Sequence, residues 1–287
     1  MREDVRDLFL SGDGISGIRL RGDDATAVES LRRFADLVHL SLQDPAGDAD
    51  AHLCSTEPAP EIAERFHLHQ DRRILSYFRG LQRGFYLHAR DDGSRRYVMA
   101  KLQKLLLYGY AASLINGGNF DLIHGALLET EPGVGTLLFG DSGIGKSTTV
   151  RRWRAAGNTA IADDMVYLYC RNGEFFARPL PTWSDCIAGK NPEYYDFNRE
   201  VRVERAWLLL RDEKKEHVGE IPANYYRLGA VKAVSETSSW LFPYLPNSWR
   251  DALLSQLMAF SVKLVGKFPP RALLAHLSGN IAETMAK

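Results

Sequence analysis

The sequence predicts an α/β fold with a mixed sheet, and three features of the chain support that class. Residues 136–139 are apolar and read as a strand, residues 140–147 form a glycine-rich loop, and residues 148–156 read as a helix. Alternating apolar patterns typical of strands lie on both sides of this segment. Helical spacing of apolar residues follows in residues 247–285. A strand that passes through a glycine loop into a helix is typical of α/β proteins.

Residues 1–115 predict a smaller α+β region that precedes the loop domain of residues 116–287. Apolar spacing over residues 27–42 predicts a helix, and the residues before it predict short strands. Residues 44–60 are rich in Pro, Ala and Asp, which is typical of a linker or an exposed loop. Whether this region binds a substrate peptide or belongs to one continuous fold stays open at this point.

Further elements are expected before the loop domain. Residues 85–88 predict a short strand, and a turn at residues 91–94 leads into a second strand at residues 97–100. A helix is expected over residues 101–116, where a pair of glycines ends it.

A hairpin leads into the glycine loop. Residues 122–128 and 136–139 predict its two strands, and residues 131–135 predict the turn between them. This arrangement is unlike the plain βαβ start of GTPase-type folds. After the loop helix, residues 159–162 predict a strand that runs into a pair of aspartates.

The remainder of the chain predicts more strands and then two helices. Residues 165–169 and 175–177 alternate around a short turn, and residues 201–210 predict a strand suited to a buried position. Apolar spacing in residues 247–265 and 269–285 predicts C-terminal helices separated by two prolines.

Composition narrows the function classes. The 287 residues include 36 basic and 36 acidic side chains, so no overall charge recruits nucleic acid or a membrane surface. The longest apolar stretch, residues 105–115, is too short and polar to span a bilayer, and residues 1–6 lack the apolar core of a signal peptide. Three widely spaced cysteines, Cys54, Cys170 and Cys186, favour reduced thiols. We expect a cytoplasmic protein without nucleic-acid or membrane partners, and leave a homo-oligomer open.

The loop fits the pattern G-x-x-x-x-G-K-[ST] and predicts a nucleotide-phosphate site, with a structural glycine turn as the alternative. Its glycines let backbone N–H groups approach phosphate oxygens without a Cβ in the way. The N-terminus of the next helix adds partial positive charge, Lys146 adds a full charge, and the Ser147 hydroxyl suits Mg²⁺. The residues expected to hold the nucleotide are Gly140, Asp141, Ser142, Gly143, Ile144, Gly145, Lys146, Ser147 and Thr148.

Polar residues flank the loop on both sides. Asp163 and Asp164 follow Ser147 by sixteen and seventeen positions and lie at a predicted strand end. One carboxylate would serve Mg²⁺ and the other would accept a proton from an attacking hydroxyl; a solvated pair or a helix cap is the alternative. His124 lies in the strand beside the loop strand, where its ring could reach the γ-phosphate region. The alternative is that His124 is a core or edge residue of the sheet.

Other side chains are more ambiguous. Residues 178–185 form a proline-stiffened stretch that suits a nucleotide or substrate wall, or a rigid packed loop. Residues 151–154 carry three arginines, which is typical of a solvated helix face beside a phosphate site, with a polyanion-binding patch as the alternative. Cations that would clamp phosphate or simply lie in solvent are Lys190, Arg202, Arg205 and Arg211.

Together these motifs resemble the catalytic domain of HPr kinase/phosphorylase. The resemblance rests on His124-Gly125-Ala126-Leu127-Leu128, the loop at residues 140–147 and Ala162-Asp163-Asp164, and it covers roughly residues 120–280. That domain belongs with phosphoenolpyruvate carboxykinases in a distinct P-loop fold. The Pro-Leu-Pro-Thr-Trp-Ser-Asp run at residues 179–185 looks more like smaller relatives from peptide-modification gene clusters. These include the C protein of the SynChlorMet cassette and the kinases of lasso-peptide precursors.

The resemblance implies an HPr kinase/PEP carboxykinase-like P-loop domain with catalytic roles for His124, Lys146 and Asp163. Asp163 would be the general base, Asp164 and Ser147 would serve Mg²⁺, and His124 would lie near the transferred phosphoryl group. Which aspartate takes which role is left open. The chain departs from HPr kinase in lacking its later glycine-rich signature and in residues 1–115, so HPr itself is not the expected substrate.

We therefore expect an ATP- and Mg²⁺-dependent kinase that phosphorylates a Ser or Thr hydroxyl of a peptide or protein, in a peptide natural-product pathway. A kinase for a small hydroxyl compound and a non-catalytic nucleotide-binding regulatory partner are the alternatives. The sequence leaves open the donor (ATP, GTP or pyrophosphate) and the identity of the acceptor.

Overall fold

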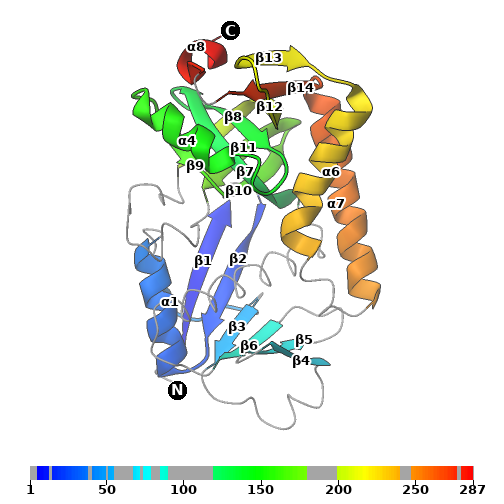
Figure 1. The fold of residues 1–287 in the computed structure, drawn as a ribbon. Helices are drawn as coiled ribbons and strands as arrows, with labels where there is room; N and C mark the ends of the chain where they lie inside the picture. The colour runs from blue at the N-terminus through cyan, green and yellow to red at the C-terminus, as the bar shows by residue number, and fades with distance from the viewer. Residues whose placement is uncertain are drawn as a thin grey trace. The chain divides into compact units, whose positions relative to one another are not determined.

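The computed structural model describes residues 5–12, 15–37, 41–49, 51–54, 67–71, 74–78, 85–89, 119–179, 199–239, 247–276 and 279–286. The chain divides into two compact units. The first contains Met1–Gly118, Trp183–Lys190 and Leu241–Leu253, and the second contains Asn119–Thr182, Asn191–Trp240 and Leu254–Lys287. Each unit has its own sheet (Figure 1). The assignment of functions to residues 1–115 and 116–287 stays a prediction.

The first unit contains a six-stranded sheet in the order β1-β2-β3-β6-β5-β4. Its strands are β1 (Arg6–Gly12), β2 (Ile15–Gly22), β3 (Ala51–Cys54), β4 (His67–Asp71), β5 (Ile74–Phe78) and β6 (Phe85–Ala89). β3 is parallel to both of its neighbours, and the other pairs are antiparallel. Helix α1 (Ala25–Leu37) packs on β2, and Leu20 and Leu31 are fully buried.

The predicted elements of this unit are confirmed in part. The helix expected over residues 27–42 is α1, the strands before it are β1 and β2, and the strand at residues 85–88 is β6. The loop expected over residues 44–60 is wrong for β3, because a four-residue strand between two parallel neighbours is too short for composition to reveal. The turn and helix expected over residues 91–116 lie outside the described residues.

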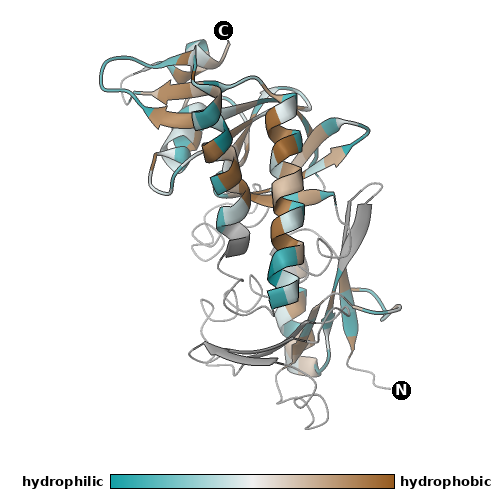
Figure 2. Ribbon diagram, turned by 90° about the vertical axis from the view of Figure 1, so that its right-hand side faces the viewer, coloured by the Kyte–Doolittle hydropathy of each residue, from teal (hydrophilic) through white to brown (hydrophobic). Residues whose placement is uncertain are grey.

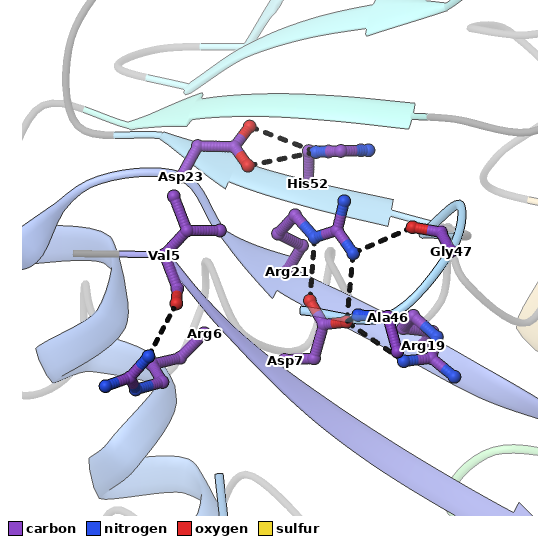
Figure 3. Close-up of polar contacts among 9 residues, drawn as sticks. All are labelled: Val5, Arg6, Asp7, Arg19, Arg21, Asp23, Ala46, Gly47 and His52. Carbon is purple, nitrogen blue, oxygen red and sulfur yellow. Dashed lines mark hydrogen bonds and ion pairs between the residues drawn. The ribbon is translucent and has the colours of Figure 1, made fainter. Parts of the chain in front are cut away.

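Asp7 joins β1 to the segment that follows α1 (Figure 3). Its carboxylate is fully buried and accepts hydrogen bonds from Arg19 Nη1 (3.0 Å) and from Arg21 Nε (2.7 Å) and Nη2 (3.0 Å). The backbone N–H of Ala46 donates to the same carboxylate at 3.1 Å, and the backbone of Asp7 pairs with that of Gln43. Burial acts to raise the pKa of Asp7, but the Arg21, Ala46 and Arg19 hydrogen bonds outweigh it and lower the pKa.

The second unit contains an eight-stranded mixed sheet, which confirms the predicted fold class in that respect. The strand order is β11-β10-β7-β8-β12-β14-β13, with β9 also paired to β7. The strands are β7 (Phe120–Glu131), β8 (Val134–Phe139), β9 (Ala160–Ala162), β10 (Met165–Arg171), β11 (Glu174–Pro179), β12 (Val201–Arg211), β13 (His217–Glu220) and β14 (Arg271–Ala275). β12 is parallel to β8 and β14, whereas the other pairs are antiparallel. Because β11 also pairs with β12, five of these strands close into a ring.

Helices cover both faces of this sheet (Figure 1). They are α4 (Lys146–Ala155), α6 (Ala223–Ser239), α8 (Ile281–Met285) and the part of α7 (Asn247–Lys267) from Leu254 onward. α4 buries Trp153 in a cluster with Trp207 and Leu209. α6 approaches the opposite face, where a Cβ on Gly229 would lie 2.6 Å from the Leu208 side chain. Successive residues of a strand point to opposite faces, so α4 and α6 lie on different sides of β12.

α7 is apolar around most of its circumference. Figure 2 shows brown turns along much of its length, and α6 runs beside it. Leu257 and Leu264 are buried, whereas Met258 and Val262 are 48% and 67% exposed. Among the described residues, no helix is long and apolar enough to cross a membrane.

Most strands of this unit follow the predicted pattern. The hairpin of β7 and β8, the strand after the loop helix, the β10–β11 hairpin and the buried β12 are confirmed. The helix expected over residues 247–265 is α7. The helix expected over residues 269–285 is wrong for β14, because a short apolar run buried beside a parallel strand has no period that separates it from a helix. α6 lies where the pattern predicts no element.

Candidate active site

The glycine loop lies between the end of β8 and the start of α4. Gly140 has a φ of +154°, and a Cβ there would lie 2.9 Å from the backbone oxygen of Leu209. Gly145, with a φ of +120°, precedes the first residue of α4. No side chain of the described residues caps this helix start. The loop backbone thus requires glycine at both positions, and the first N–H groups of α4 are available to an anion.

Lys146 turns back over the loop. Its Nζ donates to the backbone oxygens of Gly140 (2.8 Å) and Asp141 (3.1 Å), and the residue is 5% exposed. Burial lowers the pKa of Lys146, while the carboxylates of Glu236, Asp164 and Asp141 act in the opposite direction. The lysine is therefore a buried cation held at the loop. The side chains of Ser142 and Ser147 are exposed, and Thr148 is half-buried.

His124 and the two aspartates meet where three strands lie side by side. Asp163 and Asp164 form the bend between β9 and β10, which both pair with β7. The N–H of Gly125 donates to the backbone oxygen of Asp164 at 3.0 Å, and Nε2 of His124 lies 3.2 Å from Asp164 Oδ1. Asp163 is half-buried beside them. The register of the sheet thus brings together His124 and Asp164, which are forty positions apart in the sequence.

Glu236 completes the surroundings of His124. Its Oε2 lies 3.0 Å from Nδ1 of His124, so each ring nitrogen faces a carboxylate. The hydrogen bond with Asp164 raises the pKa of His124, burial and Lys146 act against it, and Glu236 adds to the rise. The sequence motifs did not indicate Glu236, because it comes from α6 and belongs to no local pattern.

Two further cations reach the loop. Lys232 of α6 pairs through Nζ with Asp141 Oδ1 at 2.6 Å. Arg211, at the end of β12, donates from Nη2 to the oxygen of Gly143 (2.7 Å) and from Nε to that of Ile144 (3.1 Å). Arg211 was one of the predicted phosphate-clamp cations, whereas Lys232 carried no sequence signal.

The other candidate cations bond elsewhere. Arg202 pairs with Glu204 of its own strand, and Arg205 donates to the backbone oxygen of Met285 at 3.0 Å. Arg152 pairs with Glu216 at 2.6 Å, and that glutamate side chain is 1% exposed. The prediction that the arginines of residues 151–154 lie in solvent is therefore wrong for Arg152. Lys190 and residues 180–185 of the expected substrate wall lie outside the described residues.

A pocket of about 530 Å³ lies behind the loop. Backbone and side chains of α4 and its N-terminal loop form one wall, and the ends of β12 and β14 form the other. Its lining includes Ile144, Gly145, Thr148, Arg211, Ala275 and His276. Charged side chains of Arg152, Asp212 and Glu213 also line it. A cavity of this size is typical of a small-molecule site. Within the described part of the chain, no group of three or more His, Cys, Asp or Glu side chains forms a metal cage.

The chain is similar to known proteins over part of its length. A sequence family described as SynChlorMet cassette protein ScmC matches residues 90–287, more than half of the chain.

Curated relatives match over shorter stretches. The HPr kinase/phosphorylase of Treponema pallidum (strain Nichols) is 47% identical over 51 residues, which is 18% of this chain and 16% of that protein. The HPr kinase/phosphorylase of Limosilactobacillus reuteri (strain DSM 20016) is 41% identical over 59 residues, which is 21% of this chain and 18% of that protein. The chain thus spans less than a fifth of the length of these relatives.

One solved structure is also similar, that of the HPr(Ser) kinase/phosphatase from Coxiella burnetii. It is 20% identical and covers 35% of this chain and 77% of that chain, with a TM-score of 0.24.

Proposed function

The chain belongs to the family of the SynChlorMet cassette protein ScmC, and we propose that it is an ATP- and Mg²⁺-dependent kinase. Its acceptor is a Ser or Thr hydroxyl of a peptide or protein. The observation that carries the proposal is the pairing of His124 with Asp164 at 3.2 Å. His124 lies on β7, which pairs with the strand that enters the glycine loop, and Asp164 lies in the bend before β10, which also pairs with β7. Similarity to proteins named HPr kinase/phosphorylase supports a peptide or protein acceptor.

The loop supports binding of nucleotide phosphates. The uncapped start of α4 offers backbone N–H groups, and Lys146 and Arg211 bring positive charge to the same loop. In the proposed complex Lys146 exchanges its two loop carbonyls for phosphate oxygens. Such an exchange costs little, because the ammonium keeps hydrogen-bond partners in both states.

The pocket behind the loop supports a nucleoside next to those phosphates. It borders Gly145 and Thr148 of the loop and the start of α4, so a base placed there would extend from phosphates held by the backbone. Apolar contact with Ile144 and Ala275 suits a purine ring. The volume of the pocket suits the nucleoside of ATP.

The residues near the loop fit Mg²⁺. Ser147 presents an exposed hydroxyl at the start of α4, and the Asp164 side chain is 40% exposed at a strand end. Mg²⁺ is usually held by one or two protein oxygens together with substrate phosphates and water, which this pair would supply. When bound, the ion would offset negative charge on the phosphates.

The reaction proposed for this site is a direct transfer of the γ-phosphoryl group to a hydroxyl. Asp163 accepts the proton of the attacking hydroxyl, and His124 and Lys146 offset the charge on the transferring group. Most of the acceleration comes from positioning and charge compensation, because phosphoryl transfer leaves little covalent work to the protein.

The experiment that tests this function uses the full chain, labelled Mg·ATP and peptides encoded beside its gene. The kinase should transfer label to a peptide hydroxyl, and Asp163→Asn should lower that rate by about 10²–10⁴-fold while ATP binding is retained. Transfer by Asp163→Asn at a near wild-type rate would show that Asp163 is not the base. Label that appears on a free amino acid would favour a small-molecule kinase, and ATP binding without any transfer would favour a regulatory partner.

A further inference from the structure

Helix α6 carries two charged side chains into the candidate site, although no motif of the sequence indicates it. The hydroxyl of Tyr226 donates to the backbone oxygen of Ala206 at 2.8 Å, and Gly229 lets the helix approach Leu208 closely. These contacts fix the start and middle of α6 against the sheet. Lys232 and Glu236 follow Gly229 by three and seven positions, so they lie on the same side of the helix.

Lys232 contacts the glycine loop at a negatively charged side chain, which is unfavourable for binding phosphate. Its partner Asp141 is a carboxylate within the glycine loop, and a polyphosphate bound there would be repelled by it. The Lys232 and Asp141 side chains are 53% and 68% exposed. A solvent-exposed ion pair of this kind contributes little to folding stability. The hydrogen bond with Asp141 also raises the pKa of Lys232, so its positive charge is retained. The consequence of this pair is therefore electrostatic, at the phosphate loop.

Glu236 acts on the other side of the same site. It faces Nδ1 of His124 at 3.0 Å, while Asp164 faces Nε2 at 3.2 Å. Two carboxylates from different elements, one close to each ring nitrogen, favour a single orientation of the ring. If only Asp164 held it, the ring would be free to turn whenever Asp164 bonds to something else.

We propose that α6 is the positioning helix of this site: Lys232 neutralises Asp141 so that the loop accepts a polyphosphate, and Glu236 fixes the ring of His124. Neither residue needs to contact substrate. The inference rests on the proposed function, since it assigns to α6 the preparation of the nucleotide loop and of His124.

A double-mutant cycle tests the Lys232 half of the proposal. Lys232→Met should weaken Mg·ATP binding about tenfold, because it exposes the uncompensated charge of Asp141. Asp141→Asn should strengthen binding by about threefold, because it removes a repulsive charge. The double variant should return to within about twofold of the wild type. Calorimetric titration of the full chain with Mg·ATP measures all four dissociation constants.

Lys263→Met is the matched control, because it removes the same charge from α7, where Lys263 bonds to Asn119. It should bind Mg·ATP as the wild type does. Unchanged binding by Lys232→Met would overturn the proposal. A double variant as weak as Lys232→Met would also overturn it, because Lys232 would then act on the phosphates directly.

Two substitutions of Glu236 test the other half. Glu236→Gln keeps an uncharged acceptor oxygen close to Nδ1, whereas Glu236→Ala removes it. We expect Glu236→Ala to slow release of labelled phosphate from Mg·ATP, with water as acceptor, by about tenfold, and Glu236→Gln to stay within about threefold of the wild type. Both should bind Mg·ATP no more weakly than the wild type, since an anion near the phosphates has gone.

Rescue by glutamine and a loss confined to kcat would not be produced by a merely structural role, which would lower the melting temperature and both kinetic constants together. Glu236→Ala at the wild-type rate, or Glu236→Gln as slow as Glu236→Ala, would overturn the assignment. A wild-type chain that binds no Mg·ATP would overturn the proposed function and this inference with it. Normal binding and turnover in the wild type and in every α6 variant would overturn this inference alone.

Discussion

At the scale of single residues, backbone geometry decides what the glycine loop accepts. Gly140 has a φ that residues with a side chain rarely adopt. A Cβ at this position would lie 2.9 Å from the backbone oxygen of Leu209. Lys146 is held by two carbonyls of the loop that it serves. The pattern G-x-x-x-x-G-K-[ST] therefore predicted where strand, loop and helix meet, since each of its positions has a local physical reason.

Gly140→Ala tests this geometry. The added Cβ would be strained by φ and would press on the backbone of Leu209, at a cost of about 1–3 kcal/mol. We expect the free energy of unfolding to fall by that amount and the affinity for Mg·ATP to fall at least about tenfold, as measured by urea unfolding and calorimetry.

Gly266→Ala is the control, because nothing lies within 4 Å of its Cβ position in α7. It should be neutral or stabilise the chain by up to about 1 kcal/mol. Wild-type ATP affinity in Gly140→Ala would show that the loop backbone does not hold phosphate.

At the scale of elements, a buried carboxylate ties the segment after α1 to the first sheet. Asp7 accepts from two arginines and from the Ala46 N–H while fully buried (Figure 3). Removing one partner of such a pair is strongly destabilising, because the remaining charges stay buried without compensation.

Asp7→Asn should therefore lower the free energy of unfolding of the chain by about 3–5 kcal/mol in urea. The exposed pair of Arg6 and Asp44 gives a control, since Asp44→Asn should cost less than about 1 kcal/mol. Equal effects from the two variants would contradict the structural role of Asp7.

The same carboxylate makes stability depend on pH. Its pKa is lowered in the folded state, so its contribution is fully present above the unfolded pKa of about 3.9 and is lost as the pH falls through the folded pKa. Acid unfolding followed by circular dichroism should be less steep for Asp7→Asn than for the wild type. An identical acid transition would contradict this linkage.

Apolar spacing predicted a helix where β14 lies. The burial of β14 in the core can be tested by substitution. Leu273 is fully buried between β12 and the helices, whereas its neighbour Leu274 is half-buried. Leu273→Ala should cost about 2–5 kcal/mol of unfolding free energy and Leu274→Ala clearly less, as measured in urea. The reverse order would place β14 with the opposite face toward the core.

At the scale of the whole molecule, local patterns predicted more of the second unit than of the first. The β7–β8 hairpin, the glycine loop, β10, β11 and β12 have strong local signals and were predicted close to their observed bounds. β3 and β14 depend on parallel neighbours distant in sequence, which no local period shows. The resemblance to the SynChlorMet cassette protein is confirmed by the family match over residues 90–287.

Sequence motifs predicted one part of the candidate site and missed another. His124, Lys146 and the aspartates belong to sequence motifs, which therefore predict them, and the structure brings His124 and Asp164 together. Lys232 and Glu236 come from α6, and only the packing of that helix reveals them. Their contribution is tertiary, and a motif search along the chain passes over them.

The proposed reaction transfers a phosphoryl group to a hydroxyl. It is tested by incubating the full chain with γ-labelled Mg·ATP and the peptides encoded beside its gene, followed by mass spectrometry. We expect a phosphorylated Ser or Thr in the peptide, formed by the wild type and lost in Asp163→Asn and Lys146→Ala. A wild-type chain that binds Mg·ATP but leaves every hydroxyl of the peptides unmodified would contradict it.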